Sequence, residues 1–259
     1  MQIAGLLPTS LQDYPGEIAA VVFTRGCNFH CPYCHNPELI GGKVGTTAEA
    51  GNMSENQPDD LPLYEEAEVL DLLAERTDYL DGVVITGGEP ALQPDLADFL
   101  QVLKSELGYK IKLDTNGSRP ELLEDLLAAE LVDMVAWDYK LPRKRYTELT
   151  SETDIEEKIG KTGRILASFA LRVEIRTTVV PGLITGQDIE KISREVNNLG
   201  DNGFPDSFIL QEFSSEQVLD SKFSEISPYR REKMQEFKKI FAEKLGEKAE
   251  DKVKIRGEV

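Results

Sequence analysis

Three closely spaced cysteines are the residues of this 259-residue chain that point most directly to chemistry. The chain has no cysteine besides Cys27, Cys31 and Cys34, which give the spacing C-x3-C-x2-C within eight residues. Thiolates this close together on one loop can bind three irons of an iron–sulfur cluster. Without a fourth cysteine, one iron stays open to an external ligand, as is typical of catalytic metal sites. The loop therefore predicts a catalytic [4Fe–4S] cluster.

A zinc site of the Cys3His type is the alternative for the same loop, because His30 and His35 lie within it. Zinc sites usually pair two ligands on one turn with two more some distance away. Here all candidates fall in one stretch, and His35 directly follows Cys34, which strains joint ligation of one ion. The spacing favours the cluster.

The segment TGGEP at residues 86–90 follows an apolar run and is the second candidate site. Paired glycines let the backbone approach a ligand closely, and the carboxylate of Glu89 can bind an ammonium group. A plain turn is the alternative for the Gly-Gly pair on its own.

Polar residues also end later apolar runs. Residues 114–117 read DTNG, residues 137–140 read WDYK, and Arg176 lies in the segment VEIRTTVVPG. Because the carboxyl ends of barrel strands gather chemistry, this joint arrangement favours a function.

Each of these residues has more than one interpretation. Clustered hard oxygens such as those of Asp114, Thr115 and Asp138 suit a monovalent cation. Asp114 and Asn116 can instead cap the helix that starts near residue 119. Lys140 can belong to a solvated basic loop with the arginines and lysine of residues 143–145.

The elements that position these residues alternate between short apolar runs and amphipathic stretches, which implies parallel strands with helical crossovers. We expect strands over 18–23, 83–86, 110–114, 134–138, 172–179 and 207–213. We expect helices over 65–76, 94–106, 119–129, 154–167, 184–198 and 228–245. Six such units are too few for a closed eight-unit barrel, so we predict an α/β fold, an open partial (β/α)6 TIM-type barrel.

Length and composition predict one domain over 1–259, with a core at about 16–213, a mobile loop over 41–62 and a C-terminal helical extension over 228–259. The formal net charge of −18 argues against a nucleic-acid partner, because phosphate binding needs clustered Lys and Arg. The first residues lack a signal peptide, and the longest apolar run is too short to span a bilayer. We therefore expect a cytoplasmic protein without a membrane partner.

The cysteine loop and the TGGEP segment together resemble the signature of the radical S-adenosylmethionine superfamily, a C-x3-C-x2-C loop followed by a GGEP-type motif. The resemblance implies that family's partial barrel and a [4Fe–4S] cluster on Cys27, Cys31 and Cys34. It implies that S-adenosylmethionine chelates the open iron and is cleaved reductively to methionine and a 5′-deoxyadenosyl radical. No catalytic side chain is then required beyond the cluster and the cofactor.

The same resemblance assigns residues to the cofactor. Gly87, Gly88 and Glu89 would bind the methionyl ammonium, and Tyr33 would lie against the adenine. Lys140 would pair with the carboxylate, and Arg176 would line the adenosyl side. The cofactor-binding set implied by the resemblance also includes Asp114, Asn116 and Asp138.

The segments DTNG, WDYK and VEIRTTVVPG resemble elements of the glycyl-radical-enzyme activases. The N-terminal region, GLLPTSLQDYPG through CHNPEL, is similar to the activating proteins of anaerobic ribonucleoside-triphosphate reductase. This implies a glycyl-radical protein as partner and a flavodoxin or ferredoxin as electron donor. A radical enzyme acting on a small precursor, such as a deazaguanine, is the alternative within enzymes, and a zinc-stabilised binding module is the alternative outside them.

One departure from the formate-lyase-type activases narrows the choice of partner protein. Pyruvate formate-lyase-type activases carry a PYH-type segment after the sixth strand, whereas residues 210–213 here read LQEF. The only two histidines, His30 and His35, lie in the cysteine loop. This favours the reductase over the formate-lyase as partner.

Overall fold

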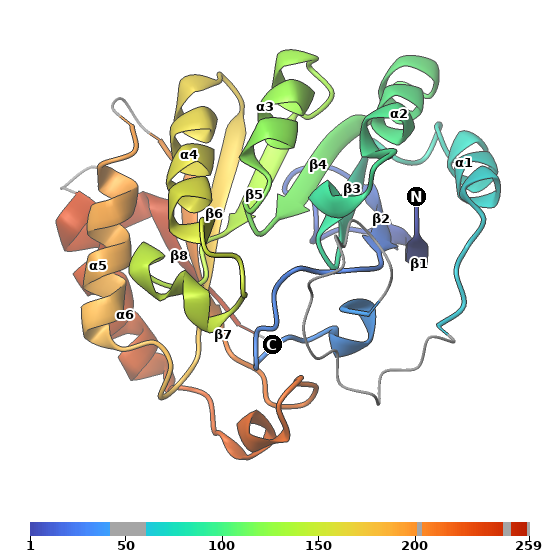
Figure 1. Ribbon diagram of the computed structural model, residues 1–259. Helices are drawn as coiled ribbons and strands as arrows, with labels where there is room; N and C mark the ends of the chain where they lie inside the picture. The colour runs from blue at the N-terminus through green and yellow to red at the C-terminus, as the bar shows by residue number, and fades with distance from the viewer. Residues whose placement is uncertain (42–60, 201–203, 246–249, 258–259) are drawn as a thin grey trace. The chain divides into compact units, whose positions relative to one another are not determined.

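The computed structural model describes residues 1–41, 61–200, 204–245 and 250–257 (Figure 1). The loop that we predicted over 41–62 therefore lies almost wholly outside the described residues. Within those residues no helix is both long enough and apolar enough to cross a membrane.

The strands follow one another in the sheet in chain order. They are β1 Ile3–Ser10, β2 Ala19–Thr24, β3 Gly82–Gly87, β4 Lys110–Thr115, β5 Met134–Asp138, β6 Arg172–Val179, β7 Ser207–Glu212 and β8 Val253–Arg256. β2, β3 and β4 pair in parallel, as do β6, β7 and β8. The six strands β2–β7 confirm the six predicted ones, and the fold is a partial barrel of the TIM type.

Two strands were not predicted. β1 pairs antiparallel with β2 and forms the first edge of the sheet. β8 pairs in parallel with β7, so the predicted helical extension over 228–259 is wrong at its end. The last residues become a strand because the β7 backbone offers them a free edge, which a pattern within the segment cannot reveal.

The helices cross between successive strands. They are α1 Glu66–Ala74, α2 Leu96–Gln101, α3 Pro120–Ala128, α4 Ile155–Ser168, α5 Gly186–Asn197 and α6 Arg231–Leu245. α5 begins at a capping box, in which Thr185 and Asp188 exchange side-chain and backbone hydrogen bonds. One-turn helices fill several connections: η1 Pro37–Leu39, η2 Pro90–Leu92, η4 Arg143–Glu148, η5 Ser221–Glu225 and η6 Glu250–Lys252. The π-helical turn η3, Val102–Glu106, continues α2.

The chain divides into two compact units. The first holds residues 1–29, 36–115 and 121–135, and the second holds 30–35, 116–120 and 136–259. The division passes through the cysteine loop, with Cys27 in the first unit and Cys31 and Cys34 in the second. Each unit therefore carries its own set of predicted site residues.

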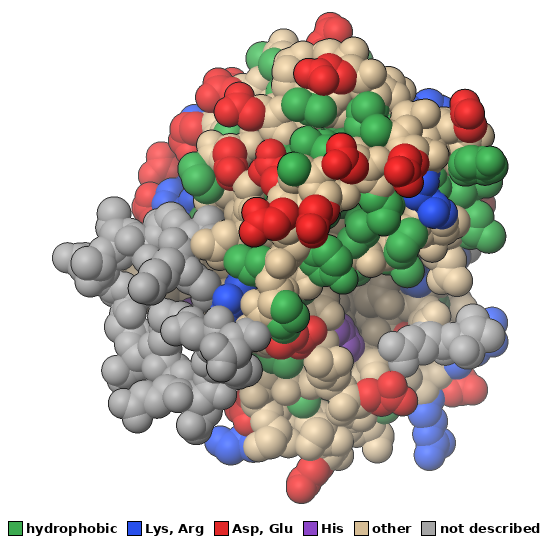
Figure 2. Space-filling model, turned by 90° about the vertical axis from the view of Figure 1, so that its right-hand side faces the viewer, with side chains coloured by type: hydrophobic (Ala, Val, Ile, Leu, Met, Phe, Trp, Pro, Cys, Tyr) green, Lys and Arg blue, Asp and Glu red, His purple; other side chains and the backbone are tan. Residues whose placement is uncertain are grey.

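Each unit has its own core. In the first, Tyr14, Ala19, Val21 and Val84 pack together as buried residues. In the second, the rings of Phe208 on β7 and Phe241 on α6 stack with centroids 3.8 Å apart. Helices α5 and α6 of this unit lie side by side (Figure 1). Acidic side chains are spread among hydrophobic ones over the face in Figure 2, as the net charge of −18 leads one to expect.

Candidate functional site

In the first unit, the turn after β3 is fastened to the segment that leads into Cys27. The amide of Gly88 donates to the carbonyl of Thr24 at 2.8 Å, and the amide of Glu89 donates to the carbonyl of Gly26 at 2.7 Å. Two backbone hydrogen bonds thus join residues that lie 63 and 64 positions apart in the sequence. The TGGEP segment is therefore more than an isolated turn.

The two glycines of this turn are required by its backbone. Gly87 has a φ of 113°, which residues with a side chain rarely adopt. A Cβ on Gly88 would collide with the carbonyl oxygen of Gly26, which is backbone and cannot turn aside. The close approach between Gly88 and Gly26 therefore excludes any side chain at Gly88.

The carboxylate of Glu89 is buried, with 1% of the residue exposed. Its Oε1 accepts the amide of Ala91 at 3.0 Å and the hydroxyl of Thr115 at 2.7 Å. Thr115 ends β4, so a residue of the next strand orients the carboxylate. A buried, oriented carboxylate is suited to bind a cationic group such as an ammonium.

The segment around Cys27 is held by further backbone contacts. The amide of Gly26 donates to the carbonyl of Leu39 at 2.7 Å, and that of Cys27 donates to Ile40 at 3.2 Å. The Cys27 sulfur accepts the amide of Phe29 at 3.4 Å. An amide donor of this kind stabilises negative charge on a thiolate sulfur.

Asp114, at the end of β4, also lies in the first unit. Its Oδ1 is paired with the ammonium of Lys112, and its Oδ2 accepts the hydroxyl of Thr86 at 3.4 Å. Lys112 is 2% exposed, so its ammonium is buried together with this contact. Lys112 was not among the predicted site residues, although it lies two residues before Asp114 and therefore on the same face of β4.

In the second unit, Cys31 and Cys34 lie on one tight turn, in which the amide of Cys34 donates to the carbonyl of Cys31 at 3.0 Å. The turn is held from two sides. The amide of His30 donates to the carbonyl of Leu149 at 2.7 Å, and the carbonyl of Pro32 accepts the amide of Asp220 at 2.9 Å. The contact to Asp220 could not be foreseen from the sequence.

Burial perturbs the ionisable groups of this turn. Desolvation raises the pKa of the Cys31 thiol to about 11, even though the nearby Lys140 acts in the opposite direction. A metal must therefore displace the proton of Cys31, as metal binding to thiols generally does. Burial likewise raises the pKa of Tyr33, whose buried hydroxyl has no hydrogen-bond partner among the described atoms.

Asp138, at the end of β5, is held between two cations of the second unit. The guanidinium of Arg176 on β6 donates to it at 2.8 Å, and the ammonium of Lys140 lies 3.3 Å away. Burial favours a raised pKa for Asp138, but Arg176 and Lys140 outweigh it and lower the pKa to about 2. Three predicted site residues thus form one ionised group.

Two further contacts concern residues at the ends of β4 and β5. The amide of Lys140 donates to the hydroxyl of Tyr146 in η4 at 2.9 Å, a positioning contact that the sequence did not indicate. The amide oxygen of Asn116 accepts the amide of Ser118 at 2.9 Å. This bond lies in the turn before α3, whose first residue is Pro120, so it does not test the alternative that Asn116 caps that helix.

The donor set fits an iron–sulfur cluster. None of the three cysteines is in a disulfide, and one of the sulfurs already accepts an amide hydrogen bond. Among the described residues no group of three or more His, Cys, Asp or Glu side chains is arranged around one metal-ion position. The three-thiolate ligand set therefore rests on the sequence spacing and on the chemistry of the thiols.

The predicted monovalent cation has less support. Asp114 is paired with Lys112, Thr115 donates to Glu89, and Asp138 is paired with Arg176 and Lys140. Each of the three predicted oxygen ligands thus has a partner within the protein.

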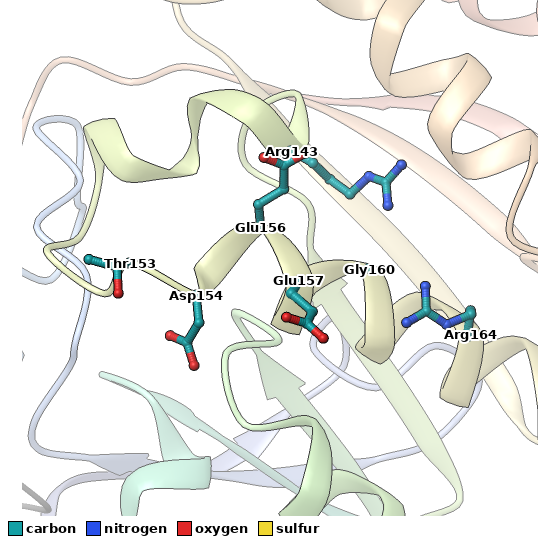
Figure 3. A pocket seen from close by; sticks show the side chains of 7 residues that line it. All are labelled: Arg143, Thr153, Asp154, Glu156, Glu157, Gly160 and Arg164. Carbon is teal, nitrogen blue, oxygen red and sulfur yellow. The ribbon is translucent and has the colours of Figure 1, made fainter.

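A cleft of about 370 Å³ opens between η4 and α4 of the second unit (Figure 3). The guanidinium groups of Arg143 and Arg164 flank Gly160, and an added Cβ there would lie 2.9 Å and 3.5 Å from their Nη1 atoms. Acidic residues line the rest of the cleft, including Glu156 and Glu157. None of the predicted cofactor-binding residues lines it, so this cleft is separate from the candidate site.

Comparison with known proteins agrees with the motifs. Residues 21–199 match the model of the Radical SAM superfamily. A Methanocaldococcus jannaschii protein assigned by name to the glycyl-radical enzyme activating enzymes is 31% identical over 92% of this chain and 90% of its own. The pyruvate formate-lyase-activating enzyme of Clostridium pasteurianum is 31% identical over 73% of both chains.

Among solved structures, Streptococcus suis SuiB bound to its precursor peptide SuiA superposes with a TM-score of 0.63 at 14% identity. The superposition covers 92% of this chain but only 48% of SuiB, so the chain spans about half of that protein. At this identity the likeness concerns the fold alone.

Proposed function

Because this chain belongs to the radical SAM superfamily, and within it to the glycyl-radical enzyme activating enzymes, we propose that it installs a glycyl radical on an anaerobic ribonucleoside-triphosphate reductase. The observation that carries the proposal is a pair of backbone hydrogen bonds. They join the turn formed by Gly87, Gly88 and Glu89, called the GGE turn below, to the segment that leads into Cys27. They hold together the two motifs on which the cofactors of this family depend. Membership of the family excludes the zinc-stabilised binding module.

The cofactors of the family are a [4Fe–4S] cluster and S-adenosylmethionine. When bound, they supply a hydrogen-abstracting group through reductive cleavage of the sulfonium carbon–sulfur bond. The protein supplies the ligands, the orientation and the exclusion of water. Cys27, Cys31 and Cys34 would hold the cluster, and none of them is in a disulfide, which supports this assignment.

The GGE turn would bind the methionyl end of S-adenosylmethionine. Gly87 and Gly88 let this turn lie directly against the backbone of Thr24 and Gly26, and the Glu89 carboxylate, oriented by Thr115, would accept the ammonium group. Lys140 would pair with the methionyl carboxylate. Its ammonium lies 3.3 Å from Asp138, at the end of β5.

The remaining assignments concern the adenosyl end. Tyr33 is buried and its hydroxyl has no hydrogen-bond partner among the described atoms, which supports a place against a ligand ring. Arg176 would line the adenosyl side, with its guanidinium fixed by Asp138 at 2.8 Å. Asp114, within β4, and Asn116, which directly follows β4, are also proposed to bind the cofactor.

The proposed partner protein rests on the sequence of residues 210–213, at the end of the predicted sixth strand. Residues 210–213 read LQEF, and both histidines lie in the cysteine loop, so the PYH-type segment of formate-lyase activases has no counterpart. This favours the reductase, although one relative at 31% identity is a formate-lyase activase. A flavodoxin or ferredoxin is the proposed electron donor.

Electron paramagnetic resonance on the partner tests the proposal. Reconstituted protein, S-adenosylmethionine, a one-electron reductant and the reductase should together give a glycyl-radical doublet. A mixture with Cys34→Ala protein is the control and should give no doublet. If the cofactor is cleaved while the reductase stays silent and a formate-lyase or a small precursor is modified instead, the proposed partner is wrong.

A further inference from the structure

Tyr139 is a buried tyrosine of the second unit whose hydroxyl the proposed function does not use. It follows Asp138 at the end of β5 and is 1% exposed. Its hydroxyl donates to Oε2 of Glu195 on α5 at 2.7 Å. The amide of Arg143 donates to the same oxygen at 3.1 Å, and its Nε lies 4.0 Å from the other oxygen. The side chain of Glu195 is 21% exposed, so this carboxylate links a buried phenol to the solvent.

The acceptor of this hydrogen bond distinguishes Tyr139 from another buried tyrosine. The hydroxyl of Tyr109, in the first unit, donates to the backbone carbonyl of Leu73 at 2.6 Å, and a carbonyl is not a base. The carboxylate of Glu195 can take up a proton. Burial and the neighbouring Tyr146 and Glu195 raise the pKa of Tyr139, so its phenol keeps its proton unless an electron is removed.

Two further aromatic rings contact Tyr139. Its ring centroid lies 4.9 Å from that of Trp137 and 5.9 Å from that of Tyr146, and both pairs are edge to face, as is common in protein cores. The buried Nε1 of Trp137 has no hydrogen-bond partner among the described atoms. An indole that loses an electron there has no base for its proton and stays a strong oxidant. Tyr139, in contrast, can pass its proton to Glu195 and is therefore easier to oxidise.

Tyr146 connects this group of rings to the cysteine turn. Its carbonyl accepts the amide of Leu149 at 2.9 Å, and the carbonyl of Leu149 accepts the amide of His30 at 2.7 Å. His30 directly precedes Cys31. Two hydrogen bonds and one ring contact therefore lead from the cysteine turn to the ring of Tyr139, all within the second unit.

We propose that Tyr139 is a redox-active tyrosine, which loses one electron to a strong oxidant while its hydroxyl proton passes to Glu195. The products are a neutral tyrosyl radical and a protonated carboxyl, and a one-electron reductant reverses the step. The oxidant belongs to the hydroxyl-radical class, which hydrogen peroxide forms at reduced iron. With the electron from Tyr139 and a proton from the solvent it becomes water.

The site thus draws oxidising equivalents away from the cysteine turn. Only this protective role rests on the proposed function, because it needs iron at the cysteines. The redox chemistry of Tyr139 rests on the contacts with Glu195 and the neighbouring rings alone.

Laser photoionisation of Trp137 in the full chain tests this chemistry without iron or S-adenosylmethionine. Trp137 is the single tryptophan of the chain, so light at the red edge of the indole absorption ejects an electron from one known residue. A cobalt(III) ammine in the solution takes up that electron. Transient absorption should then show the indole radical decaying as a phenoxyl radical appears. The conversion should be slower in heavy water, because the hydroxyl proton moves with the electron.

Two variants and a control identify the residues. Tyr139→Phe should prolong the life of the indole radical. Glu195→Gln keeps a hydrogen-bond acceptor but not the base, and should slow the conversion roughly a hundredfold. The matched control Tyr109→Phe should behave like the wild type. An indole radical that decays equally fast in Tyr139→Phe would overturn the proposal, as would an unchanged rate in Glu195→Gln. If neither variant folds, the absence of a solvent isotope effect in the wild type would overturn it.

Peroxide treatment of the reconstituted protein tests the protective role. Peptide mass spectrometry should find irreversible oxidation of Cys31 and Cys34 several-fold faster in Tyr139→Phe than in the wild type or in Tyr109→Phe. Equal rates in the three proteins would refute the protective role. If the wild type holds no iron–sulfur cluster, the proposed function fails, while photoionisation still decides the chemistry of Tyr139.

Discussion

The thiol of Cys31 and the carboxylate of Asp138 show how the second unit prepares its residues. Burial raises the pKa of Cys31 to about 11, so the free thiol keeps its proton at neutral pH until a metal displaces it. Asp138 is also subject to burial, but Arg176 and Lys140 lower its pKa to about 2. Cys31 is thus a protonated thiol until a metal binds it, whereas Asp138 stays a fixed negative charge.

Single replacement of Cys27, Cys31 or Cys34 by alanine should abolish binding of the iron–sulfur cluster. Three thiolates are already the smallest ligand set that leaves one iron open. Iron and sulfide analysis of anaerobically reconstituted protein measures this, with His35→Ala as the control that should retain the cluster. An intact cluster in any cysteine variant would remove that residue from the ligand set.

Glu89→Gln should weaken the binding of S-adenosylmethionine by about 1.5–3 kcal/mol while leaving the iron content unchanged. Glutamine still accepts the hydrogen bonds of Thr115 and Ala91, so the turn is kept and only the charge is lost. Titration calorimetry measures the affinity, and Glu121→Gln on α3 is the exposed control. Unchanged affinity would show that the cofactor ammonium binds elsewhere.

Asp138→Asn should make the protein less stable at neutral pH but not in strong acid. The carboxyl of Asp138 has a pKa of about 2 in the fold against an ordinary 3.8, so its contribution is complete above pH 4 and is lost as the pH falls through about 2. Denaturant unfolding of wild type and variant between neutral and acid pH measures the difference. A difference that grows towards acid pH would contradict the pairing with Arg176 and Lys140.

At the scale of elements, the sequence predicted the six parallel strands because each is a short apolar run followed by an amphipathic stretch. The same pattern placed the candidate residues at strand ends, which is where β3, β4 and β5 carry them. The joining of the GGE turn to Gly26 was not predictable, because the hydrogen bonds are made by backbone atoms that carry no sequence signal.

Other features escaped prediction because tertiary contacts decide them. β8 pairs only because β7 presents an open edge, and β1 pairs with β2 by an antiparallel register unlike the rest of the sheet. The burial of Lys112 and its pairing with Asp114 were likewise not predicted from the sequence of β4. For β1 and β8, the strand that decides the pairing is another part of the chain, so the residue pattern within each segment does not reveal it.

Gly88→Ala should distort the turn after β3 and reduce the affinity for S-adenosylmethionine more strongly than Glu89→Gln does. The added Cβ would meet the backbone oxygen of Gly26, so the loop leading into Cys27 must move as well. The matched control is Gly186→Ala, where the nearest atoms lie 3.6 Å away. Cofactor binding and cluster content measured together would reveal the effect, and normal values for both in Gly88→Ala would refute the proposed close approach.

At the scale of the whole molecule, the net charge of −18 bears on the partners. An acidic protein attracts acidic redox proteins, such as a flavodoxin or ferredoxin, poorly over long distances. Association with such a donor should therefore speed up as ionic strength rises if the overall charge dominates, and slow down if a local basic surface does. Stopped-flow reduction of the cluster at several salt concentrations distinguishes the two cases, and we expect the first.

We propose that this protein removes a hydrogen atom from a glycine of a partner reductase. The most direct test supplies that reductase with its glycines deuterated at the α-carbon and analyses the nucleoside product by mass spectrometry. The account predicts that 5′-deoxyadenosine gains one deuterium in step with the appearance of the glycyl radical on the reductase. Unlabelled 5′-deoxyadenosine formed alongside a full glycyl radical, or cleavage without any radical on the reductase, would contradict it.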